Sequence, residues 1–254
     1  MKILNGGCRV YDASDGTIAS RGNWTSRTVM SRSSGAPLIT QTINDYGPGI
    51  SPATLNPASE EVHYVVAGAG VCHVGGYRYD VRPGSALFVP PGTTYHVENP
   101  GPGTIRIISA CCPEDAGRQV LDTPPAPPAR SGTAPNLMVQ EADREPMRAG
   151  RDREFRLLVN TDVGCKQVTQ FIGWIPASKA PFHRHMYEEG ICVLQGRAIL
   201  HIKGDSSAPE LGPGSGVYFP VGVVHCVENP GPDPIRLLGV FHPSGSPAAA
   251  YEDS

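Results

Sequence analysis

Three histidines and one glutamate in the second half of the chain have the types and spacing of ligands to one metal ion. His183, His185 and Glu189 lie within seven residues of one another, and His225 follows in a separate stretch. In a strand, side chains two positions apart share a face, so His183 and His185 point the same way and Glu189 can join them across a short bend. Imidazole and carboxylate groups together suit transition metals better than calcium. The pattern predicts a metal site with room for water, dioxygen or a substrate on the ion.

Two sequence motifs carry these residues. One is HxHxxxE at residues 183–189, followed by Gly196, and the other is GxxxxxPxGxxHxxxN at residues 214–229. Together they resemble the paired motifs of the cupin superfamily, except that the glycine expected six residues before His183 is Ala177. The resemblance implies a small jelly-roll barrel that holds one ion with three histidines and one glutamate.

The chain also repeats itself. Residues 61–68 match residues 189–196 at an offset of 128 positions, and residues 84–101 match residues 214–231 at an offset of 130. Repetition of a whole domain extends the resemblance to the bicupins. The implied fold is all-β, with two tandem cupin barrels of the double-stranded β-helix or jelly-roll type.

Composition supports many short strands joined by turns. Thirty glycines and 26 prolines separate short apolar runs, and no long segment carries a sustained helical stripe. We expect an N-terminal cupin over residues 1–112, a proline-rich linker over 113–135 and a C-terminal cupin over 136–254. Residues 1–37 precede the first motif and can add edge strands to either barrel. The charged run at residues 141–156 is expected to form a solvated surface.

The two repeats differ at the ligand positions. The counterparts of His183, His185 and His225 in the first repeat are two apolar residues and a phenol, and only the glutamate is kept as Glu61. Such side chains cannot replace three imidazoles, so we predict that the first barrel binds no metal. We expect one divalent transition metal ion per chain, with iron or manganese favoured and zinc, nickel or copper also compatible. The replaced positions are Leu55, Pro57 and Tyr95, and two other histidines, His63 and His96, lie close to them.

The resemblance implies a metal-dependent enzyme that acts on a small organic molecule. The leading hypothesis is a dioxygenase-type oxidoreductase in which Glu189, besides binding the metal, is catalytic and carries a proton. One alternative is a non-redox hydrolase, isomerase or cyclase similar to the ureidoglycine aminohydrolase group of bicupins, although that group arranges its ligands differently. Another is a small-molecule-binding module without catalysis. Bound zinc would favour the non-redox hypothesis and bound iron the oxidative one.

Four further residues are candidates for the substrate pocket. Gln170 and Trp174 share one face of an expected strand, together with Val168 and Ile172, and that face is a candidate for the barrel interior. Phe182 and Tyr187 flank the histidine pair. Glu188 should point away from Glu189 into solvent.

Charge and cysteine content indicate which partners and which cellular compartment to expect. Twenty-one basic and 24 acidic residues give a net charge of −3, which provides no electrostatic footprint for nucleic acid. No apolar run is long enough for a membrane span, and the first residues do not form a signal-peptide core. The seven cysteines form no CxxC pair and are expected to be buried free thiols. We therefore expect a cytoplasmic protein with a small-molecule substrate, and the resemblance implies a homodimer.

Overall fold

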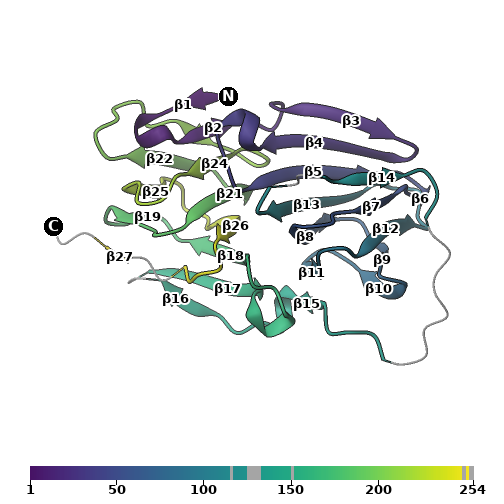
Figure 1. Ribbon diagram of the computed structural model, residues 1–254. Helices are drawn as coiled ribbons and strands as arrows, with labels where there is room; N and C mark the ends of the chain where they lie inside the picture. The colour runs from purple at the N-terminus through teal and green to yellow at the C-terminus, as the bar shows by residue number, and fades with distance from the viewer. Residues whose placement is uncertain (115–116, 125–132, 150–151, 248–249, 252–254) are drawn as a thin grey trace.

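A computed structural model describes residues 1–114, 117–124, 133–149, 152–247 and 250–251. These residues form four antiparallel sheets, arranged as two barrels side by side (Figure 1). The expected all-β fold with two jelly-roll barrels is confirmed. Helical structure in the described residues is confined to four short 3-10 turns, η1 (Asn5–Gly7), η2 (Arg32–Ser34), η3 (Glu141–Asp143) and η4 (Thr161–Val163).

The second barrel consists of a large sheet and a small sheet. The large sheet has the spatial order β1 (Lys2–Ile3), β2 (Arg9–Tyr11), β24 (Gly216–Phe219), β21 (Glu188–Gln195), β26 (Ile235–His242), β18 (Thr169–Ile175), β17 (Arg153–Val159) and β16 (Met147–Ala149). The small sheet has the order β23 (Glu210–Leu211), β22 (Ala198–Ile202), β25 (His225–Asn229), β20 (His183–Arg184) and β27 (Ala250–Tyr251), with β19 (Ser178–Lys179) also paired to β25.

The first barrel repeats this design. Its large sheet has the order β15 (Met138–Gln140), β11 (Ser85–Val89), β8 (Glu60–Ala67), β13 (Ile105–Cys112), β5 (Thr40–Tyr46), β4 (Trp24–Met30) and β3 (Thr17–Arg21). Its small sheet has the order β10 (Tyr77–Val81), β9 (Gly70–Val74), β12 (Thr94–Asn99), β7 (Ala53–Leu55) and β14 (Gln119–Leu121), with β6 (Gly49–Ile50) also paired to β12.

Each barrel takes strands from the other half of the chain. Strand β2 pairs with β24 of the second barrel, whereas β15 pairs with β11 of the first. Tyr11 at the end of β2 lies opposite Gly216, where an added Cβ would approach the Tyr11 hydroxyl to 2.4 Å. Each barrel therefore contains strands from both sides of the expected domain boundaries at residues 112 and 136. These boundaries remain predictions. Within the expected linker, β14 is an edge strand of the first barrel, and residues 125–132 lie outside the described residues.

The apolar interior consists of three cores, one inside each barrel and one between them. One fills the second barrel around Phe171, and another fills the first around Leu87. The third lies between the large sheets, where Tyr64 and Ile172 are among the buried residues contributed by the two halves. Full burial of one large apolar side chain stabilises a fold by roughly 1.5–3 kcal/mol, so this shared core strongly favours the paired arrangement. Both faces of the large sheets are consequently covered.

Polar groups in the interface reinforce this packing. The carboxylate of Glu60 in the first barrel accepts hydrogen bonds from the backbone nitrogens of Lys166, at 2.9 and 3.0 Å, and Gln167, at 2.6 Å. Its repeat counterpart Glu188 is 6% exposed, and burial raises its pKa. The expectation that Glu188 is solvated is therefore wrong, because the first barrel covers the sheet face to which it points. Hydrogen bonding with Tyr218 and with the Leu38 backbone of the first barrel offsets part of this rise in the pKa.

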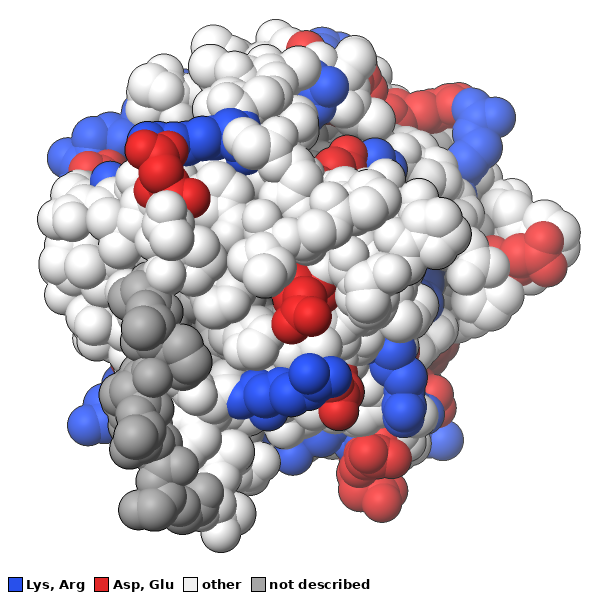
Figure 2. Space-filling view, turned by 90° about the vertical axis from the view of Figure 1, so that its right-hand side faces the viewer, with Lys and Arg blue, Asp and Glu red and all other residues white. Residues whose placement is uncertain are grey.

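The remaining chemical features of the fold concern thiols, helices and surface charge. All seven cysteines are buried and free, which confirms their expected role. Among the described residues no helix is long and apolar enough to cross a bilayer. On the molecule's side shown in Figure 2, basic and acidic groups are interspersed rather than gathered into a broad patch of one sign.

Candidate metal centre

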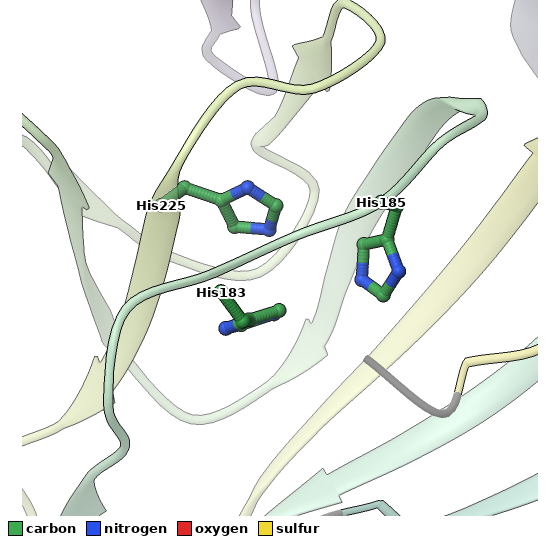
Figure 3. Close-up of side chains that lie close together, drawn as sticks. All are labelled: His183, His185 and His225. Atoms are coloured by element: carbon green, nitrogen blue, oxygen red, sulfur yellow. The ribbon is translucent and has the colours of Figure 1, made fainter. Parts of the chain in front are cut away.

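The four predicted ligands converge where the two sheets of the second barrel face each other. His183 on β20 lies directly opposite His225, the first residue of β25, in the small sheet. Glu189 comes from β21 of the large sheet, and His185 lies in the connection between β20 and β21. Figure 3 shows the three imidazole rings turned toward a common space. The motifs thus bring together residues from both walls of one barrel.

The distances are those of a ligand cluster. One nitrogen from each of His183, His185 and His225 lies within 4.8 Å of the other two. Oε2 of Glu189 lies 3.5 Å from Nε2 of His225 and 3.8 Å from Nε2 of His185. In the described part of the chain this oxygen is buried and has no hydrogen-bond partner. A buried, unsatisfied carboxylate oxygen among three imidazoles fits a divalent cation, which would supply the missing partner.

Burial sets the protonation of these groups in the absence of metal. It lowers the pKa of His183 and of His185 to about 4, and lowers that of His225 well below its usual value. Neutral imidazole is the form that binds a metal. Desolvation also raises the pKa of Glu189 to about 8, since no nearby cation compensates for its burial. The site therefore holds an uncompensated carboxylate that a cation would stabilise.

Neighbouring groups orient the histidine rings. Nδ1 of His225 donates a 2.9 Å hydrogen bond to the carbonyl of Val223, which directs Nε2 toward the cluster. The Phe219 ring stacks on the His225 ring at 3.9 Å between centroids. On the other side, the ring of Phe241 lies 4.8 Å from that of His185. Such packing limits the rotamers available to the ligands.

A cavity of about 80 Å³ adjoins the ligands. A space of this volume has room for several water molecules or for one small molecule. Outside the four predicted ligands, the titratable residues among the described ones that border it are Arg153 and Glu154. Most of its wall is apolar and includes Phe155, Phe171, Ile191, Phe219, Leu237 and Phe241.

Two of the expected pocket residues come from β18, and they have different positions. Trp174 contributes to the cavity lining, and its ring also lies against the guanidinium groups of Arg156 and Arg236. Gln170 does not line the cavity, and the strand alternation places it on the same face as Ile172, which packs in the core between the barrels. The prediction that the Gln170 face of this strand lines the barrel interior is therefore wrong. Phe171, on the opposite face, points into the cavity instead.

The other two expected pocket residues lie outside the cavity lining. Phe182 is half-buried before the first histidine. The Tyr187 ring is nearly parallel to that of His185, with centroids 6.0 Å apart, and packs against Phe241. Tyr187 thus supports a ligand from behind rather than facing a bound molecule.

The first barrel has a different network at the corresponding position. Arg118, just before β14, donates to the Tyr95 hydroxyl oxygen at 2.9 Å and lies 3.4 Å from Oε1 of Glu61. Burial alone would raise the pKa of Glu61, but Arg118 and His63 outweigh it and hold this pKa below its usual value. A side-chain cation therefore balances the retained glutamate. The prediction that this barrel binds no metal remains a prediction.

Two arginines near the two centres were not anticipated from the sequence. Arg153 belongs to the charged run that we expected to be solvated, yet it is 8% exposed and lines the cavity. The sequence contains one signal for its burial, because in a strand Arg153 shares a face with the apolar residues Phe155 and Leu157. Arg118 follows the first barrel in a segment expected to be linker, where no periodicity marks it.

Comparison with known proteins shows the family of the chain. The model of the cupin domain family matches residues 45–111 and 172–241, one region in each barrel. The chain belongs to the cupin family. Both barrels are cupin domains, so the bicupin resemblance is confirmed. The uncharacterized protein MJ1618 of Methanocaldococcus jannaschii is 32% identical over 54 residues, which span 21% of this chain and 42% of that protein.

Solved bicupin structures share the fold. A deletion mutant of Bacillus subtilis oxalate decarboxylase has a TM-score of 0.75 and 15% identity, and the match covers 97% of this chain and 79% of that one. A structure of the same decarboxylase, described for its Mn(II) centres, has a TM-score of 0.77 at 15% identity, with 99% and 80% covered. At this identity the likeness shows the shared fold.

Proposed function

We propose that the second barrel is the active site of a metal-dependent enzyme that acts on a small organic molecule, with a dioxygenase-type oxidation as its reaction. One observation carries the proposal. Three neutral imidazoles and the buried, unsatisfied oxygen of Glu189 converge at the end of a small, mostly apolar cavity. This combination provides a metal position and a mostly apolar space for a substrate beside it.

The donor set fits one divalent ion per chain. His183, His185, Glu189 and His225 would hold it, and iron or manganese is the favoured ion because the set combines imidazole with a carboxylate. The manganese centres of the oxalate decarboxylases, which share this fold, agree with that choice. When bound, such an ion polarises substrate oxygens and, if redox-active, permits chemistry with dioxygen.

The cavity wall favours oxidation over hydrolysis. Besides Glu189, the only carboxylate that the described residues bring to the lining is Glu154, whose side chain is largely exposed, so the wall adds no buried base to activate water. The apolar rings that form most of the wall accommodate an apolar molecule such as dioxygen. Oxidation at a metal centre is therefore the better match to the described residues.

Glu189 has a second role in this proposal. In the metal-free site, burial raises the pKa of the carboxyl to about 8, so when it is not bound to an ion it takes up a proton more readily than an exposed glutamate does. A glutamate that loosens from the metal centre can then hold a proton released by the substrate. In this proposal Glu189 is both ligand and catalytic residue.

Oxygen consumption tests the reaction type. Protein loaded with Fe(II) or Mn(II) is incubated with a panel of small organic acids, enols and catechols in an oxygen-electrode cell. We expect oxygen uptake in proportion to product, and no turnover when dioxygen is removed. Equal product without dioxygen would overturn the oxidative assignment while leaving the metal site in place.

Non-oxidative decarboxylation is the second candidate, because the fold is shared with oxalate decarboxylases and the cavity suits a substrate of their size. Carbon dioxide released from a small carboxylic acid without net oxygen uptake would favour it. Affinity for a small molecule with no turnover under either atmosphere would instead indicate a binding module.

A further inference from the structure

Arg153 is a buried cation with spare hydrogen-bonding capacity in the wall of the metal cavity. Its guanidinium donates through Nη2 to the carbonyl of Val227 at 2.8 Å. Its Nε is buried and has no hydrogen-bond partner among the described residues. The side chain is 8% exposed, so bulk water does not replace the missing partner.

No carboxylate of the described chain compensates this charge. Glu154 is the next residue on β17 and points to the other face of the strand at that position, where it is exposed. Glu189 lines the same cavity, but its oxygens do not lie within ion-pair distance of Arg153 in the described structure. Burying a guanidinium without an anionic partner costs free energy. Arginine is also the residue type that best binds a planar carboxylate, because its fork of N–H groups can form two parallel hydrogen bonds.

The hydrogen bond to Val227 presets this geometry. Because Nη2 is fixed on a carbonyl of β25, the guanidinium plane cannot rotate freely, and this cavity-lining side chain holds its other N–H groups in a set orientation. A preorganised donor loses little side-chain entropy on binding. His183 and His225 line the same cavity, so a molecule held by Arg153 would have its remaining atoms near the ligand cluster.

We propose that Arg153 binds the carboxylate of the substrate and that the substrate class is short-chain organic acids. This inference rests on the proposed function, because it assigns the substrate of that same site. The carboxylate accepts hydrogen bonds from Arg153, and the rest of the molecule occupies the small apolar space between Phe171, Phe241 and the metal ligands. Neutral analogues of the same shape lack the charge that the guanidinium recognises.

Binding to protein loaded with Zn(II), which is not redox-active, tests this assignment without turnover. Acetate, pyruvate and oxalate are titrated calorimetrically, with acetamide and pyruvamide as neutral counterparts. We expect at least one of the acids to bind the wild-type protein, and Arg153→Gln to weaken it by about tenfold or more, the effect of about 1.4 kcal/mol. Arg153→Lys should keep part of the affinity, because it retains the charge but loses the fork geometry.

Arg156→Gln is the matched control, since Arg156 lies on the same strand against Trp174 and is not part of the cavity lining. This variant should leave carboxylate affinity unchanged. Equal affinity of wild-type protein and both Arg153 variants, or binding of the amides as tight as that of the acids, would overturn the assignment. Metal content is measured on every sample. Loss of zinc from the wild-type protein would refute the proposed metal centre, whereas full zinc occupancy without carboxylate binding would refute only the role of Arg153.

Discussion

In the first barrel, the hydroxyl of Tyr95 donates a 2.7 Å hydrogen bond to Oε1 of Glu61. The equivalent pair in the second barrel is His225 and Glu189, with Nε2 and Oε2 separated by 3.5 Å. The two pairs occupy corresponding strands of the two repeats. Oε2 of each glutamate is buried without a hydrogen-bond partner among the described residues. The repeats differ in charge balance: Arg118 lies 3.4 Å from Oε1 of Glu61, whereas the neighbours of Glu189 are histidines.

The ion pair in the first barrel has a consequence for stability. Arg118→Met would leave the buried carboxylate of Glu61 without its nearest cation, and removal of one partner of a buried pair typically costs about 3–5 kcal/mol. We expect a loss of that order in the free energy of unfolding, measured by urea denaturation. Adding Glu61→Gln should recover part of it. Arg78→Met, which breaks an exposed pair with Asp80, is the control and should change stability little. A loss from Arg118→Met no greater than from the control would contradict the structural role.

Removing a ligand should affect metal binding without unfolding the protein. Loss of a group that merely orients a ligand costs about 10- to 100-fold in metal affinity, so His185→Ala should weaken binding by at least that range. The measurement is a competition titration with a chelator of known affinity. His201→Ala is the control, because His201 pairs with Glu228 away from the cluster. Similar metal affinities for the two variants would argue against His185 as a ligand.

Glu60, which lies at the interface between the barrels, is expected to stabilise their contact. In Glu60→Ala the backbone nitrogens of Lys166 and Gln167 lose a charged acceptor, and hydrogen bonds to charged groups contribute about 1.5–3 kcal/mol each. We expect destabilisation of about 3 kcal/mol in urea unfolding, with a smaller effect for Glu60→Gln. A change in stability below about 0.5 kcal/mol would show that this contact does not stabilise the interface.

The metal-free protein should have a particular dependence of stability on pH. His183 and His185 have folded pKa values of about 4, below the unfolded value of 6.5, so their contribution is present above pH 6.5 and is lost as the pH falls toward 4. Glu189 has a folded pKa of about 8, above the unfolded 4.5, so its contribution is present below pH 4.5 and is lost as the pH rises through 8.

Between pH 6.5 and 8 only the glutamate effect remains. Thermal unfolding of chelator-treated protein should therefore show a falling Tm across this range, and Glu189→Gln should flatten the curve. Bound metal requires the carboxylate and neutral imidazoles, so it should remove the fall as well. An identical slope for wild-type and Glu189→Gln protein would contradict the uncompensated burial of Glu189.

Local spacing was enough to predict the repeat and the convergence of His183, His185, Glu189 and His225, because each motif fixes which side chains share a strand face. It was not enough to orient β18. Every residue of that strand except Trp174 is fully buried, so alternation separates Gln170 from Phe171 but does not tell which of them faces the barrel interior. Glu188 was misjudged for the same reason, since the face opposite the metal ligand is covered by the other barrel.

The remaining differences depend on long-range contacts. The segments that cross between barrels, β2 and β15, are three residues each, too short for periodicity to indicate their partners. Arg153 and Arg118 lie in charged or proline-rich sequence that is typical of surfaces, and only the folded chain brings them to Val227 and Glu61. The place of each of these buried cations depends on the fold rather than on the local sequence.

The most direct test of the account is the metal content of the wild-type protein, purified without added metal and measured by elemental analysis per chain. The structure predicts about one equivalent of a divalent transition metal, lost when His225 is replaced by alanine and retained in Tyr95→Phe. Two equivalents per chain would contradict the protein-balanced centre of the first barrel. No bound metal, even after incubation with Fe(II), Mn(II) or Zn(II), would contradict the centre formed by His183, His185, Glu189 and His225.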